Sequence, residues 1–169
     1  MEEEDPELRN EYSLIIQSNN ELLQRLIEDV LDISKIESNS IAFSFTNVYL
    51  PDLMHELYTA ALLHMPPRVD LVMDDVPDVS LYTDRSRLMQ IISNLLNNAI
   101  KHTMEGSIRM GYENRNDSVR FFVGDTGEGI PKEKLDPIFS RFVQLNEWNE
   151  GVGLGLAICK GLVTKMGGR

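Results

Sequence analysis

The sequence has 169 residues, of which 42% are hydrophobic and 25% charged, a balance typical of one globular domain. Its formal net charge of -11 at pH 7 argues against nonspecific nucleic-acid binding, which needs a basic surface. The single cysteine, Cys159, excludes an internal disulfide, while the acidic start and the lack of about 18 consecutive apolar residues predict neither a signal peptide nor membrane contact.

The first predicted element is a long amphipathic helix over residues 6–38. Its apolar residues recur in steps of three and four, at Tyr12, Ile16, Leu23, Leu26, Val30 and Ile33. A second apolar row beside them widens the stripe. A stripe of this width predicts burial in a helix bundle formed between chains. Packing of the helix on its own domain is the alternative.

The rest of the chain mixes strands and helices. Period-two alternation predicts strands at 41–45, 69–73, 79–82, 107–112 and 119–123. Helical periodicity predicts helices at 51–65, from a cap at Asp84 or Ser86 to about His102, and at 154–165. Residues 114–117 have the composition of a hairpin turn, and residues 127–150 that of a long loop with at most a short helix. This mixed order indicates an α+β layer fold.

Three glycines, Gly151, Gly153 and Gly155, stand directly before the last predicted helix. Glycine lets the backbone approach a phosphate closely, and a helix N-terminus offers unpaired N–H groups to an anion. The run lacks the Gly-Lys-Ser/Thr ending of a Walker loop. Alone, it is equally compatible with a simple turn.

Two further stretches carry groups that suit a nucleotide. Asp125 ends a predicted strand and is followed by small residues, so its carboxylate can accept a hydrogen bond from a base amino group. Asn94, Asn98 and Lys101 are spaced by four and three and share one helix face. Two amides and an ammonium can hold a metal and phosphate oxygens. A strand-ending turn and a solvated polar face are the plain alternatives.

In this order and spacing, the stretches resemble the sensor histidine kinases of two-component systems, over nearly the whole chain. Residues 94–101 resemble the N box of that family, 125–129 its first glycine box, 139–142 its F box, and 151–155 its second glycine box. The resemblance implies a GHKL, or Bergerat, fold: a two-layer α/β sandwich with a mixed sheet, preceded by one long bundle helix. It divides the chain into residues 1–40, the second dimerisation helix, and 41–169, the catalytic ATP-binding domain.

The resemblance also implies the chemistry, which is transfer of the γ-phosphoryl group of Mg-ATP to a histidine in signal transduction. Asn98 would coordinate Mg²⁺, supported by Asn94, and Lys101 would reach the phosphates; these three are the implied catalytic residues. Asp125 would accept the adenine amino group, and Phe139 and Phe142 would tether a lid. The implied nucleotide-binding set is Asn94, Asn98, Lys101, His102, Asp125, Gly127, Gly129, Ile130, Phe142, Gly151, Gly153, Leu154, Gly155 and Leu156.

The chain departs from the family pattern in three places. Its histidines, His55, His64 and His102, lack the phospho-acceptor motif, so we predict no autophosphorylation. The family continues beyond a Gly-Gly pair with two more strands, which predicts that this sheet lacks its final strands. Asn94 stands where related ATPases carry a glutamate base, which predicts slow ATP hydrolysis.

The resemblance implies partners and a location as well. These are homodimerisation through the N-terminal helix, a response regulator receiver domain, and a cytoplasmic site in a parent protein anchored in the inner membrane. Two alternatives stay open: a dimerisation or regulatory module without nucleotide, and an ATP hydrolase of the same fold. The intact pocket residues argue against the first, and Asn94 argues against the second.

Overall fold

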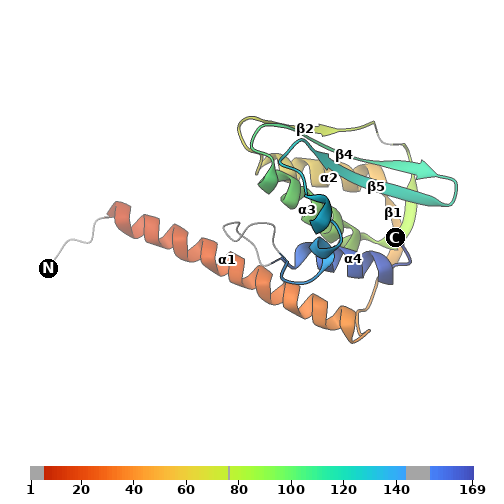
Figure 1. Cartoon of the computed structure of the whole chain (residues 1–169), viewed down its shortest axis with the longest axis horizontal. Coiled ribbons are helices and arrows are strands. Elements are labelled where there is room, and N and C mark those ends of the chain that lie inside the picture. Colours follow the sequence, from red (N-terminus) through yellow and green to blue (C-terminus); the bar gives the residue numbers. More distant parts are fainter. Residues whose placement is uncertain (1–5, 76, 144–152) are drawn as a thin grey trace.

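The structure, a computed structural model, describes residues 6–75, 77–143 and 153–169 (Figure 1). Its elements in chain order are α1 (Pro6–Glu37), β1 (Phe45–Tyr49), α2 (Leu50–Leu62), β2 (Val69–Met73), β3 (Ser80–Asp84), α3 (Arg85–His102), β4 (Gly106–Arg115), β5 (Ser118–Asp125), the short 3-10 helices η1 (Lys132–Lys134) and η2 (Pro137–Phe139), and α4 (Gly155–Lys165). The predicted α+β class is confirmed.

The strands form two groups. In the larger group the order is β2-β4-β5, with β2 parallel to β4 and β5 antiparallel to it, so the predicted mixed sheet is confirmed. The second group is the antiparallel pair β1-β3, with Phe45 opposite Asp84 and Tyr49 opposite Ser80. The hairpin between β4 and β5 is tighter than predicted, because Arg115 already pairs with Ser118.

The strand predicted at 41–45 is wrong. Residues 41–44 belong to no strand, and β1 begins only at Phe45. Ile41 and Phe43 are nevertheless partly buried, where they pack against the apolar cluster between α3 and α4. The alternation in the sequence therefore reflected side-chain packing of an extended segment, whereas a strand also needs a neighbour to complete its hydrogen bonds.

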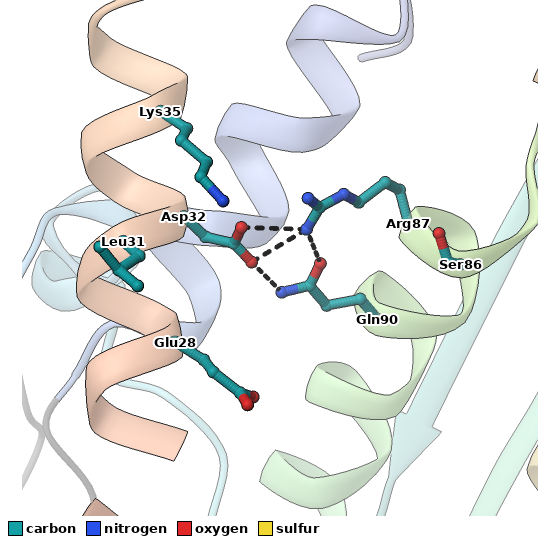
Figure 2. Close-up of a pocket in the computed structure, with 7 residues that line it drawn as sticks. All are labelled: Glu28, Leu31, Asp32, Lys35, Ser86, Arg87 and Gln90. Carbon is teal, nitrogen blue, oxygen red and sulfur yellow. Dashed lines mark hydrogen bonds and ion pairs between the residues drawn. The ribbon is translucent and has the colours of Figure 1, made fainter. Parts of the chain in front are cut away.

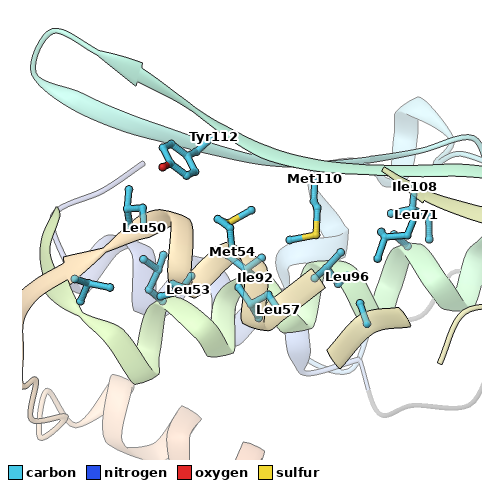
Figure 3. Close-up of a cluster of buried hydrophobic side chains, with 14 of the residues drawn as sticks. Leu50, Leu53, Met54, Leu57, Leu71, Ile92, Leu96, Ile108, Met110 and Tyr112 are labelled. Atoms are coloured by element: carbon cyan, nitrogen blue, oxygen red, sulfur yellow. The ribbon is translucent and has the colours of Figure 1, made fainter. Parts of the chain in front are cut away.

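The main core lies between the larger sheet and the helices α2 and α3 (Figure 3). Fully buried side chains come from all three parts: Leu50, Leu53 and Met54 from α2, Ile92 from α3, and Ile108 and Met110 from β4. This layer of helices on one sheet face is the predicted two-layer arrangement. Packing in this core holds α3 in place by its apolar face, while its other faces stay available to contact α1, α4 and the loop after β5.

A second, smaller core lies between α3 and α4. Its buried residues are Ile91, Leu154, Ile158, Cys159 and Leu162. Ile33 and Ile36, from the last turns of α1, pack against it. A Cβ on Gly161 would lie only 2.9 Å from Cγ2 of Ile36, so this glycine lets α1 approach α4 closely. The end of α1 therefore packs on its own domain.

The rest of α1 extends away from the domain (Figure 1). Ten large apolar side chains along it are between 46% and 65% exposed: Leu8, Tyr12, Leu14, Ile15, Ile16, Leu22, Leu23, Ile27, Val30 and Leu31. We call this set the α1 stripe. The alternative prediction, packing of the helix on its own domain, is confirmed for its last turns, and burial of the α1 stripe in a bundle between chains stays a prediction. Among the described residues, no helix has the length and apolar character needed to cross a membrane.

Candidate functional site

Helix α3 carries the polar residues of the predicted site, and Asp84 fixes where it begins. Asp84 Oδ1 accepts hydrogen bonds from the Arg87 amide at 3.0 Å and the Ser86 hydroxyl at 2.7 Å, and Oδ2 accepts from the Ser44 amide at 2.7 Å. Burial alone would raise the pKa of Asp84, but these hydrogen bonds outweigh it and hold the pKa below its ordinary value. Asp84, rather than Ser86, is the cap.

The middle of α3 meets the second glycine box. Asn94 is half-buried, and its Nδ2 donates to the carbonyl oxygen of Gly155, the first residue of α4, at 3.4 Å. A Cβ on Gly155 would lie 3.7 Å from Cγ of Asn94, so the two residues are in contact. Asn98, one turn further along α3, is also half-buried, and Lys101 is exposed. The N box and the start of α4 therefore lie side by side.

The end of α3 meets the first glycine box. A Cβ on Gly127 would lie 2.2 Å from the carbonyl oxygen of His102, so only glycine fits where this loop touches the helix. Asp125 Oδ1 accepts from the Gly127 amide at 2.9 Å, and His102 Nδ1 lies 2.9 Å from Glu128 Oε1. Gly129 has φ +71, a conformation that favours glycine. The loop is thus held against the helix by backbone contact and by side chains.

A cleft of about 410 Å³ opens between the end of α3 and this loop, which is within the usual size of small-molecule sites. Its lining residues are Lys101, His102, Met104, Glu105, Thr126, Gly127 and Glu128. Three members of the predicted nucleotide set, Lys101, His102 and Gly127, are among them. A slightly larger cavity, of about 440 Å³, lies elsewhere, between α1 and α3, and includes none of that set.

The F box lies against the second glycine box. The Phe142 amide donates to the Gly153 carbonyl at 3.0 Å, and Gly153 has φ +70. A Cβ on Gly153 would lie 2.6 Å from the carbonyl oxygen of Val143. Leu154 is 2% exposed and packs in the second core, while Leu156 is half-buried. Gly151 lies outside the described residues.

Both phenylalanines predicted to tether the lid are exposed, and the tethering itself stays a prediction because residues 144–152 lie outside the described part of the chain. Phe142 is 66% exposed, because its backbone turns at φ 60 to reach Gly153. Phe139 is 40% exposed, with the Lys160 ammonium 5.7 Å from its ring centroid. The buried residue of this segment is Ile138. Ile130, also in the predicted set, is 41% exposed.

The residues present fit a magnesium ion that is held together with phosphates. Within the described ranges, no group of three or more histidine, cysteine or acidic side chains could hold a metal alone. Mg²⁺ usually takes one or two protein oxygens and completes its shell with phosphates and water. A half-buried amide such as Asn98 supplies a ligand of that kind.

Sequence reasoning missed a polar cluster between α1 and α3. Asp32 is buried and is bonded by Arg87 and Gln90, and in the same region the Arg141 guanidinium lies 2.5 Å from Glu37. One signal was available, because Arg87 and Gln90 precede Asn94 by seven and four residues and share its helix face. The partner, Asp32, could not be found from local spacing.

Comparisons with known proteins show the family of this chain. Residues 83–169 match the family described as histidine kinase-, DNA gyrase B-, and HSP90-like ATPase. The sensor histidine kinase RcsC of Escherichia coli strain K12 is 38% identical over 160 residues, covering 89% of this chain and 17% of RcsC. The chain thus spans about a sixth of the length of that relative.

Two solved structures have a similar fold. Full-length ShkA, in complex with AMPPNP, is 29% identical with a TM-score of 0.76, covering 96% of this chain and 35% of ShkA. The histidine kinase ThkA, in complex with the response regulator protein TrrA, is 30% identical with a TM-score of 0.69, covering 98% of this chain and 47% of ThkA.

Proposed function

This chain belongs to the family of histidine kinase-, DNA gyrase B- and HSP90-like ATPases, as an ATP-binding domain of the sensor histidine kinase type, and we propose that it positions Mg-ATP for phosphoryl transfer to a histidine. The acceptor histidine lies outside this chain. Residues 1–40 are the second dimerisation helix of the parent kinase, and residues 41–169 are its catalytic domain.

One observation carries the proposal: α3 contacts both glycine boxes. Asn94 bonds to Gly155 on one side, and His102 abuts Gly127 on the other. The amide-bearing helix thereby links the loop after a strand-end carboxylate to the N-terminus of α4, although Asn98, Asp125 and Gly153 do not line the cleft at the end of α3. This combination provides the groups that a nucleotide needs, namely an acceptor for its base, donors for its phosphates and oxygen for its metal.

Each residue is assigned a role that its surroundings allow. Asp125 uses Oδ1 to hold the Gly127 amide, which leaves Oδ2 to accept a hydrogen bond from the adenine amino group. Backbone amides at Gly153 and Gly155 bind phosphate oxygens at the start of α4, as helix N-termini do. Asn98, with Asn94 beside it, presents an amide oxygen to the metal. The flanking Gly127 and Gly129 leave room beside the base.

The transfer needs positioning and charge neutralisation more than covalent catalysis. The bond from the γ-phosphorus to the ADP oxygen breaks while a phosphorus–nitrogen bond forms to a neutral imidazole. When bound, Mg²⁺ neutralises the developing charge on the phosphate oxygens. Lys101 adds a second positive charge near them. Asn94 is an amide and no general base, so water is not activated and hydrolysis is slow.

Two partners follow from the same proposal. The α1 stripe is the surface through which the intact kinase forms a homodimer, since bundle helices bury stripes of this kind. A response regulator receiver domain accepts the phosphoryl group from the histidine, a proposal supported by the ThkA structure in complex with the response regulator protein TrrA. The catalytic domain works in the cytoplasm, in a parent protein anchored in the inner membrane.

Calorimetric titration with AMPPNP and Mg²⁺ tests the proposal. We expect Asn98→Ala to weaken binding at least tenfold, about 1.4 kcal/mol. Asn97→Ala is the matched control, because Asn97 is the adjacent amide and is exposed. Equal loss in both variants would contradict the assignment of Asn98. Absence of binding to the unchanged chain would favour the nucleotide-free module, and fast ATP turnover would favour the hydrolase.

A further inference from the structure

A ring of hydrogen bonds joins α1 to the first turns of α3 (Figure 2). Arg87 Nη1 donates to both carboxylate oxygens of Asp32, each at 3.0 Å, and to Gln90 Oε1 at 2.8 Å. Gln90 Nε2 donates to Asp32 Oδ2 at 2.7 Å. The Asp32 carboxylate therefore accepts hydrogen bonds from two residues one turn apart on α3. Two such bonds fix the orientation of α1 relative to α3 as well as the distance between the two helices.

Burial makes this contact selective. Asp32 is 8% exposed, and the side chain of Arg87 is 22% exposed. A charge out of water is costly unless it is paired and hydrogen-bonded, so Asp32 is stabilised here by its ion pair with Arg87 and by its hydrogen bond from Gln90. The cost of desolvation also offsets much of the attraction within a buried pair. The contact thus specifies one arrangement of the two helices without making it irreversible.

The interface around the ring is loosely packed. A cavity of about 440 Å³ opens at the ring, and the polar residues Glu28, Lys35 and Ser86 line it together with the ring itself and Leu31. The contact between α1 and α3 is therefore hydrogen-bonded rather than close-packed. Close packing of α1 is confined to its last turns, where Ile33 and Ile36 meet the second core. If α1 and α3 separated at the ring, water would solvate the exposed charges of Asp32 and Arg87.

The ring lies on the same face of α3 as the proposed nucleotide site. Arg87, Gln90, Asn94, Asn98 and Lys101 recur in steps of three and four along that face. Its first part bonds to α1, its middle bonds to α4, and its last part borders the cleft. A rigid helix therefore relates the direction of α1 to the direction in which the nucleotide site faces.

We propose that Asp32 is a positioning residue that holds the end of α1 to α3 and thereby sets where the catalytic domain stands relative to the dimerisation helix. The proposal rests on the proposed function, in which the acceptor histidine belongs to the helical part of the kinase. With the ring intact, the domain keeps one orientation. With the ring broken, only the apolar contacts of Ile33 and Ile36 with the second core hold α1 to the domain, so the direction of α1 is less well fixed, while nucleotide affinity is unchanged.

Distances between spin labels test this directly. Cysteines placed at Ser18 on α1 and Thr59 on α2, both exposed, carry the labels, and Cys159 stays unlabelled because it is buried. Labelled chain is diluted into unlabelled chain, so that only distances within one chain are seen. We expect a narrow distribution in the unchanged chain. In Asp32→Asn we expect the docked fraction to fall about tenfold relative to the undocked, as expected for lost hydrogen bonds to a charge.

Matched variants separate charge from contact. Glu28→Gln removes the same charge from the same cavity, where Glu28 makes no hydrogen bond in the described part of the chain, so its distribution should stay narrow. Gln90→Leu is the milder variant, losing one donor while Arg87 remains, and should broaden the distribution less. The double variant Asp32→Arg with Arg87→Asp should restore the narrow distribution at least in part.

The outcomes are separable from those of the proposed function. Unchanged AMPPNP affinity with a broadened distribution in Asp32→Asn supports the proposal. A narrow distribution in Asp32→Asn and Gln90→Leu, or equal broadening in Glu28→Gln, would overturn it. Absence of AMPPNP binding to the unchanged chain would instead overturn the proposed function. The distance distributions would still decide whether Asp32 holds α1 to α3.

Discussion

The apolar and polar faces of α3 differ in the kind of partner each one has. Leu88, Ile92, Leu96 and Ala99 form the apolar face and are buried in the main core, against the sheet and α2. Arg87, Gln90, Asn94, Asn98 and Lys101 form the polar face, which meets α1, α4 and the cleft. The apolar face contacts only other parts of residues 41–169, whereas the polar face also contacts α1, which lies outside that range. We therefore expect changes on the first to alter stability, and changes on the second to alter binding and orientation.

The largest expected effect comes from breaking the apolar face. Ile92 is 2% exposed, and Ile92→Ala would leave a cavity in a close-packed core. We expect the free energy of unfolding to fall by about 3 kcal/mol, measured by urea denaturation. Asn97→Ala, on the exposed side of the same helix, should change it by less than about 0.5 kcal/mol. Similar losses in the two variants would remove the distinction between the faces.

A smaller loss of stability is expected from removing Asp84, the N-cap of α3. The pKa of Asp84 is lowered in the folded protein, so its contribution to stability is present above its ordinary pKa and is lost as the pH falls through the lowered value. Asp84→Ala should cost about 1 kcal/mol at pH 7. The difference between the two proteins should shrink on acidification, as followed by thermal unfolding at a series of pH values. A difference that stays constant down to pH 2 would contradict this.

The smallest expected effect concerns the reactivity of Cys159, which is buried where α4 packs against α3. Burial raises the pKa of the Cys159 thiol to about 11, and its Sγ lies 3.6 Å from the Ile91 carbonyl oxygen. We expect Ellman's reagent to modify it at pH 8 only very slowly until denaturant is added. Asn94→Ala, which removes the bond to Gly155, should speed modification about threefold, as for a weak hydrogen bond. Rapid modification of the unchanged chain would contradict the burial.

Local patterns in the sequence were sufficient for α3. The cap, predicted at Asp84 or Ser86, the apolar period and the spacing of Asn94 and Asn98 all depend on residues within a few turns of one another, and the helix is present with Asp84 as its cap and its apolar face buried. The start of β1 was mispredicted, because alternation at Ile41 and Phe43 carries no information about which neighbour completes a ladder. Pattern reading therefore succeeded where the cause was local.

Contacts between distant segments could not be predicted. Asp32 and Arg87 are 55 residues apart, and nothing near either one indicates the other. The exposure of Phe142 goes with a backbone turn toward Gly153, eleven positions further along the chain. The spacing of the two glycine boxes suggested that they serve one ligand, but their contacts with His102 and Asn94 emerge only from the fold.

The α1 stripe has a consequence for every measurement on this chain. The helix leaves ten large apolar side chains about half exposed to water. Association of two such helices buries part of this apolar surface and lowers the free energy. Mass action then ties the apparent melting temperature to the amount of protein in the cuvette. Dilution should therefore lower the melting temperature. A melting temperature for this chain has a defined meaning only when the protein concentration is given with it.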